Sequence, residues 1–121
     1  MNTDPVIFAL ANPIPEIMPD VAKKAGAKIV ASGRSDFDNQ INNSLVFPGL
    51  FDGVINSGIR IINDDIKIIV ANEIANMVSK EESDYDYIIP DPLDKTVAKN
   101  ISACIMDYVR NLTTEYNKRT L

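Results

Sequence analysis

The sequence has 121 residues, of which 45% are hydrophobic and 24% charged, and its formal net charge is −5. This length suffices for one domain with one core, and the composition is that of a folded globular protein rather than a disordered one. The acidic balance argues against a nucleic-acid partner, because phosphate binding needs a clustered basic face. No apolar stretch reaches transmembrane length, so we expect no membrane partner.

Residue types that are absent or rare limit the chemistry and the compartment. The chain has no histidine, which excludes a Ser-His-Asp or Cys-His nucleophile and a His-ligated metal site within these residues. The lone Cys104 has no second cysteine with which to form an internal disulfide bond. A reducing, cytoplasmic location is therefore expected.

The first part of the chain predicts two short buried strands on either side of a helix. Residues 6–11 (VIFALA) are an apolar run that ends at an Asn-Pro turn signal, which is typical of a buried strand. Residues 15–25 carry apolar side chains at helical spacing and stop before Gly26, a suitable C-terminal cap. Residues 28–32 (KIVAS) predict the second strand, which a long polar loop follows.

Two helices are predicted next. A helix over residues 42–55 should be kinked or split by Pro48 and Gly49. Asn63 and Asp64 suit the N-cap of the following helix. One side of that helix is apolar, with Ile66, Ile69, Val70, Ile74 and Met77.

The last part of the chain predicts a short strand and a long helix. Residues 81–86 (EESDYD) suggest a solvated loop, and residues 87–89 (YII) a short strand that Pro90 stops. Asp94 starts a final helix. Its apolar stripe consists of Val97, Ile101, Cys104, Ile105, Tyr108 and Leu112. Strands that alternate with helices predict an α/β layer with a thin parallel sheet of three strands.

Polar side chains follow both of the first two strands. Asn12 ends the first, and the loop over residues 32–43 follows the second. In an open parallel sheet, ligands gather outside the carboxyl ends of the strands, so both clusters should face one crevice if the strands are neighbours. A G-x-G-x-x-G phosphate loop is missing, because Gly33 and Gly49 lack that spacing. The residues alone therefore favour a piece of a nucleotide-binding sheet.

Four segments carry a specific family resemblance: DPVIFALANPIPEI, GAKIVASGRSDFDNQINNSLVFPGLFDG, INDDIKIIVANEIA and YIIPDPLD. In this order and spacing, they resemble the C-terminal part of malic enzymes of the compact prokaryotic type. The resemblance implies oxidative decarboxylation of malate to pyruvate with NAD or NADP and a divalent metal, Mg or Mn. It implies that residues 1–121 are a single incomplete domain, the second half of a Rossmann-like dinucleotide-binding domain with a short parallel sheet and flanking helices.

The resemblance also implies which residues are present and which are absent. Asn12 would lie by the nicotinamide and the substrate, Asn42 or Asn43 would contact malate, and Gly33 and Asn43 would line the cofactor site. A carboxamide suits this chemistry, because it donates to a carboxylate and accepts from a hydroxyl without titrating. Free N–H groups at the helix start by Asn43 could add anion affinity. The catalytic Tyr and Lys, the metal ligands and the glycine-rich loop would lie upstream, so the isolated chain should be inactive.

Several alternatives stay open. Asn42 or Asn43 could cap the following helix, and Arg34 could pair with a cofactor phosphate or with Asp36. Asp36 and Asp38 are more typical of Asx-turns than of a metal site. The chain could also be a stand-alone, non-catalytic nucleotide-binding or assembly module. Without the N-terminal half of the enzyme, an exposed strand edge should favour a homo-oligomer.

Overall fold

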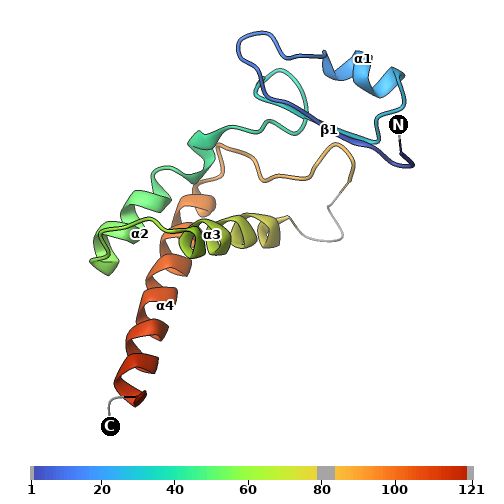
Figure 1. Ribbon diagram of the computed structural model, residues 1–121. Helices are drawn as coiled ribbons and strands as arrows, with labels where there is room; N and C mark the ends of the chain where they lie inside the picture. Colours follow the sequence, from blue (N-terminus) through green and yellow to red (C-terminus); the bar gives the residue numbers. More distant parts are fainter. Residues whose placement is uncertain (1, 79–83, 120–121) are drawn as a thin grey trace. The chain divides into compact units, whose positions relative to one another are not determined.

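Two parallel strands, β1 (Val6–Ala9) and β2 (Ile29–Ser32), form the only sheet within residues 2–78 and 84–119, which the computed structural model describes. The strands pair over all four of their residues (Figure 1). Strand, helix and strand follow one another in the first part of the chain, and the elements after β2 are helical. The predicted parallel α/β class is therefore confirmed, with a sheet of two strands rather than three.

The third strand that the sequence predicts at residues 87–89 does not form. The N–H of Tyr87 donates to the carbonyl of Asp84 over 3.0 Å in a tight turn. The N–H of Ile88 donates to the side-chain oxygen of Asn39, 2.9 Å away, and not to a neighbouring strand. The prediction was wrong because a side chain distant in the sequence satisfies the backbone here.

The chain folds into two compact units. The first unit contains residues 2–42, 78 and 84–90, and the second unit contains residues 43–77 and 91–119. The predicted loop over residues 81–86 lies partly outside the described residues. Each unit has its own buried apolar side chains.

Helix α1 (Pro19–Lys24) is shorter than the predicted helix over residues 15–25. It begins with a proline, whose fixed φ suits the first helical position. It starts late because the Glu16 carboxylate binds the N–H of Ala11, which holds the preceding residues in a turn. Gly26 ends the helix with a φ of +102°, as its predicted capping role requires.

The core of the first unit lies between α1 and the sheet. Figure 1 shows α1 on one side of the two strands. The buried side chains in this layer belong to Ala22, Ala27 and Val30, with Ile7 and Ile17 packed against them. On β1, Val6 and Phe8 alternate with these inward positions and are 56% and 53% exposed.

The second unit is helical. Its elements are a 3₁₀ helix, η1 (Asn43–Val46), and three α-helices, α2 (Gly49–Ser57), α3 (Asp64–Met77) and α4 (Lys95–Arg119). The predicted split at Pro48 and Gly49 is confirmed, because η1 ends and α2 begins on either side of Pro48. None of the described helices is long and apolar enough to cross a membrane.

Side-chain caps start α3 and α4. Asn63 Oδ1 accepts from the N–H of Ile66 over 3.1 Å, and Asp94 Oδ1 accepts from the N–H of Thr96 over 2.8 Å. Both bonds satisfy amides that have no partner within their own helix. The two predicted helix starts are confirmed.

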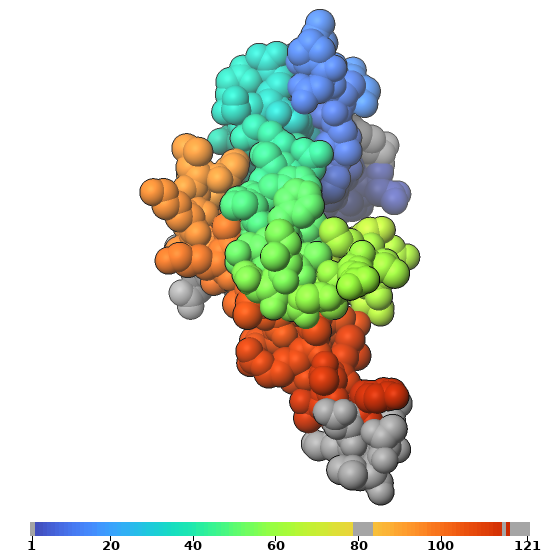
Figure 2. Space-filling model, turned by 90° about the vertical axis from the view of Figure 1, so that its left-hand side faces the viewer, coloured from blue at the N-terminus to red at the C-terminus, as the bar shows by residue number. Residues whose placement is uncertain are grey.

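Close packing of α2 on α4 builds the core of the second unit. Figures 1 and 2 both show α2, in green, directly against α4, in orange to red. A Cβ at Gly53 would lie 2.9 Å from Ile105 Cβ, and one at Gly49 would overlap the carbonyl oxygen of Ala98. Ser102 Oγ donates to Asp52 Oδ2 across the same contact, over 2.5 Å. Glycine therefore sets the distance between the two helices.

The apolar stripe predicted for α4 is buried only in part. Its innermost side chains are those of Val97, Ile101 and Ile105. Cys104 and Tyr108 are half-buried, and the Tyr108 hydroxyl donates to Asp65 of α3 over 3.3 Å. Leu112 is 48% exposed, because the C-terminal end of α4 runs past α2 and α3 (Figure 1).

Candidate functional site

The turn after β1 carries Asn12 and is closed by an acidic side chain. The N–H of Ala11 donates to Glu16 Oε2 over 3.1 Å. This hydrogen bond lowers the pKa of the Glu16 carboxyl, because it favours the ionised form. The Asn12–Pro13 peptide bond is cis, and the Asn12 side chain is exposed. Asn12 therefore stands beyond the carboxyl end of β1 with its carboxamide open to a ligand.

Gly33, the first residue after β2, lies against Asn12. A Cβ at Gly33 would be 3.4 Å from Asn12 Nδ2 and 3.7 Å from Asn12 Cγ. The backbone of Gly33 thus lies beside the Asn12 carboxamide, and a long side chain at position 33 would contact this group. The two strand ends meet at one edge of the sheet, as the sequence predicts for neighbouring strands.

Arg34 is paired within its own loop. Its Nε and one terminal nitrogen donate to the two carboxylate oxygens of Asp36, over 2.8 and 2.7 Å. The guanidinium also lies 5.6 Å from the ring centre of Phe37. The pair lowers the pKa of Asp36 and raises that of Arg34. Of the two predicted alternatives for Arg34, the structure contains the ion pair with Asp36.

The described acidic residues do not fit a metal ion. Within residues 2–78 and 84–119, no three side chains of the His, Cys, Asp and Glu types are grouped to hold one. Asp36 is bound to Arg34, and Asp38 Oδ2 lies 4.0 Å from Lys23 Nζ. Both carboxylates of this loop therefore already have a cationic side chain as a neighbour.

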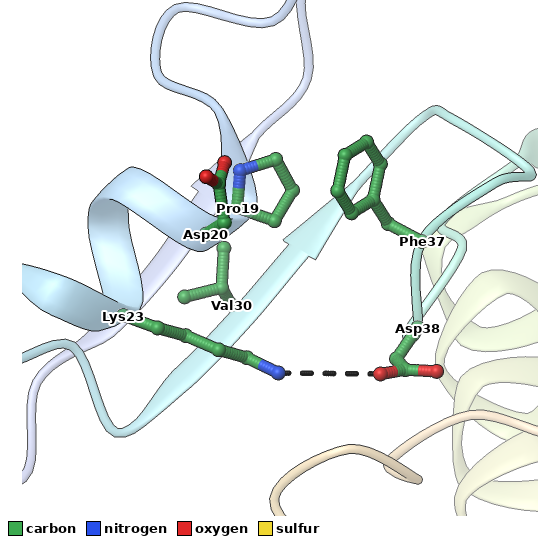
Figure 3. A pocket seen from close by; sticks show the side chains of 6 residues that line it. All are labelled: Pro19, Asp20, Lys23, Val30, Phe37 and Asp38. Carbon is green, nitrogen blue, oxygen red and sulfur yellow. Dashed lines mark ion pairs between the residues drawn. The ribbon is translucent and has the colours of Figure 1, made fainter.

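A pocket of about 100 Å³ lies between α1, β2 and the loop that follows (Figure 3). It is lined by Pro19, Asp20, Lys23, Val30, Phe37 and Asp38. Lys23 Nζ is 2.5 Å from Asp86 Oδ1, in addition to its longer contact with Asp38. Since two carboxylates flank the ammonium group, the pocket has little positive charge to attract a phosphate.

Asn39 has a structural role in the loop after β2. The sequence pattern did not distinguish this residue from its polar neighbours. Its side chain is buried and makes three hydrogen bonds, to Val30, Tyr85 and Ile88. No local pattern distinguishes Asn39 from Asn42, because the partners come from β2 and from a segment more than 40 residues away.

The asparagine pair that follows is divided between the two units. Asn42 is half-buried and is the last residue of this part of the first unit. Asn43 is exposed and begins η1 in the second unit. Because η1 has only four residues, it offers little of the aligned dipole that attracts anions to longer helices. The contact of either residue with malate stays a prediction.

Comparison with known proteins places the chain in a family. The family model described as "Malic enzyme, NAD binding domain" matches residues 1–110. The chain belongs to this family. The bifunctional malic/malolactic enzyme of Bacillus subtilis (strain 168) is 50% identical to it over 105 residues, which are 87% of this chain and 26% of that enzyme. The NADP-dependent malic enzyme of Escherichia coli (strain K12) is 36% identical over 120 residues, covering 87% of this chain and 16% of that enzyme.

A solved structure agrees with the fold. The malic enzyme from Pyrococcus horikoshii matches with a TM-score of 0.86 and 46% identity, over 93% of this chain and 26% of that one. The α/β fold is therefore that of part of a Rossmann-like, dinucleotide-binding malic enzyme domain. The chain spans 26% or less of the length of each of these three relatives.

Proposed function

We propose that this chain is the C-terminal portion of the NAD(P)-binding domain of a malic enzyme. The complete enzyme would convert malate to pyruvate by oxidative decarboxylation in the cytoplasm, with NAD or NADP and a divalent metal ion. The observation that carries the proposal is the position of Asn12 against Gly33 at the carboxyl edge of the sheet, in a chain that the malic enzyme family model matches.

The residues of this chain would bind and orient the cofactor and the malate. Asn12 Nδ2 can donate to a carboxylate or to the carboxamide of the nicotinamide, and Oδ1 can accept from the malate hydroxyl. Gly33 lets a flat ring approach, because no side chain extends over the Asn12 carboxamide from that side. When bound, NAD(P) supplies the acceptor for the hydride of malate. Asn42 or Asn43 would add a donor to a malate carboxylate.

The remaining chemistry belongs to the rest of the enzyme under this proposal. The described residues do not fit a metal. Burial raises the pKa of the Cys104 thiol to about 11, which makes it a poor nucleophile. The exposed apolar side chains on β1 support the proposal, because a larger domain would cover them. The same exposure disfavours a stand-alone, non-catalytic module.

A hybrid enzyme tests the proposal. In this hybrid, the residues of this chain replace the matching segment of the Bacillus subtilis relative. We expect the folded hybrid to form NADH or NADPH when malate is added, whereas the pure isolated chain should not. Asn12→Ala should lower kcat/KM for malate about 10- to 100-fold, the effect of one or two lost hydrogen bonds to a bound ligand.

The matched control is Asn100→Ala, which removes an exposed carboxamide from α4 and should leave kcat/KM unchanged. A folded but inactive hybrid would contradict the proposed function. Turnover by the isolated chain would contradict the assignment of the catalytic groups to the rest of the enzyme.

A further inference from the structure

The side chain of Asn39 uses both ends of its carboxamide. Nδ2 donates to the carbonyl of Val30 over 3.2 Å and to that of Tyr85 over 2.7 Å. Oδ1 accepts from the N–H of Ile88 over 2.9 Å. The residue is only 6% exposed, so water cannot readily replace these partners, and each group left unpaired would be costly.

The backbone at Asn39 also restricts which residue can stand there. Its φ is +54°, in the left-handed region that glycine, asparagine and aspartate enter most readily. Aspartate has no N–H to offer the two carbonyls, and glycine has no side chain at all. Asparagine is the residue type that meets both the backbone and the hydrogen-bonding requirements.

Asn39 lies where the loop after β2 returns to the sheet. The N–H of Ser32 donates to the carbonyl of Asn39 over 3.3 Å, and the N–H of Ile41 donates to the carbonyl of Ser32 over 2.8 Å. The chain therefore leaves the sheet at Gly33 and returns beside Ser32 at Asn39. Asn42 follows three residues after Asn39. The side chain of Asn39 fastens this return to β2 and to the segment that contains Tyr85.

We propose that Asn39 is a positioning residue for the substrate site: its buried carboxamide holds the returning loop so that Asn42 is presented to malate. This inference rests on the proposed function and assigns the malate contact to Asn42. Asn39 does not touch the substrate and acts through the loop. Its loss should weaken malate binding more than cofactor binding, because Asn12 and Gly33, which would lie by the nicotinamide, make none of the hydrogen bonds of the Asn39 side chain.

The test uses two substitutions in the hybrid enzyme. Asn39→Asp keeps the backbone conformation and the acceptor for Ile88, but it places a carboxylate against two carbonyls. Asn39→Gly keeps the backbone conformation and removes all three bonds. For both folded variants we expect KM for malate to rise about tenfold, as for one lost hydrogen bond, while KM for NAD(P) changes less than about twofold. The two variants perturb the site in different ways, so either one carries the test should the other not fold.

Two controls separate positioning from general destabilisation. Val70→Ala leaves a cavity in the core of the second unit and should lower Tm with both KM values unchanged. Asn100→Asp makes the same chemical change as Asn39→Asp on an exposed face of α4 and should alter neither Tm nor KM.

The outcomes distinguish this inference from the proposed function. A rise in KM for malate alone supports the positioning role. A lower Tm with unchanged KM for malate, an equal rise in both KM values, or no change at all overturns it while the proposed function stands. An inactive parent hybrid overturns the proposed function, and this inference falls with it.

Discussion

Burial decides what an asparagine does in the first unit. Asn12 is exposed beyond β1, so its carboxamide is available to a ligand. Asn39 is buried, and all of its hydrogen-bonding groups that face the protein have partners. Sequence alone gives both residues the same chemistry, and only the surrounding structure separates the binding role proposed for Asn12 from the positioning role proposed for Asn39.

The turn that carries Asn12 should depend on the charge of Glu16. Because the folded-state pKa of this carboxyl lies below its ordinary value of 4.5, the carboxylate stabilises the fold above that value. This contribution is lost as the pH falls through the lowered pKa. The parent chain should therefore have a larger free energy of unfolding than Glu16→Gln at neutral pH. This difference should disappear in acid. Urea unfolding of both chains across this pH range measures it.

A second variant checks that the bond to Ala11 is the cause. Glu16→Ala removes the acceptor entirely, so the N–H of Ala11 should exchange faster with deuterium than in either the parent or Glu16→Gln. A stability difference between parent and Glu16→Gln that stays constant with pH would rule out the proposed linkage.

At the scale of helices and strands, the close crossing of α2 and α4 depends on Gly49. A Cβ there would meet the backbone of Ala98, with 2.9 Å to its Cα, and backbone atoms cannot turn aside as a flexible side chain can. Gly49→Ala should therefore destabilise the chain by about 1–3 kcal/mol, which outweighs a gain in helix propensity of at most about 1 kcal/mol. Thermal or urea unfolding measures the change.

Ile55→Ala is the matched control on α2, because Ile55 is 74% exposed. Its effect should stay within about 0.5 kcal/mol. Equal stability of Gly49→Ala and the parent would show that the two helices can move apart at little cost.

Local signals predicted the elements that local interactions build. The caps at Asn63 and Asp94 and the break at Pro48 each depend on residues within a few positions, and the structure contains all three. The strand predicted at 87–89 failed for the opposite reason, since the partner of Ile88 is Asn39, 49 positions away. In the same way, the adjacency of Asn12 and Gly33 followed from strand order, whereas the role of Asn39 required the fold.

At the scale of the whole molecule, the sheet matters most, because one of its faces has no covering layer within the described residues of the first unit. α1 packs over the side of Ile7 and Val30, but on the other side Val6, Phe8 and Leu10 are 53–56% exposed. Among the described strands, β1 pairs only with β2, so one edge of β1 has no strand beside it, whereas the returning loop occupies the other edge of β2 at Ser32. Parallel sheets are normally buried on both faces. Either the rest of a malic enzyme or another copy of the chain should cover this surface.

The isolated chain should therefore self-associate through β1. Replacing Val6 and Phe8 together with threonine keeps a high strand propensity and removes most of the exposed apolar area, so the double variant should shift toward monomer. Light scattering after gel filtration, over a range of concentrations, measures the change.

The matched control replaces Ile61 and Leu93, which are 75% and 86% exposed in the second unit, with threonine. If non-specific hydrophobic contacts caused the association, this control would shift the chain toward monomer equally well. A parent chain that stays monomeric at high concentration would show that the free edge and the apolar face of β1 do not suffice for pairing.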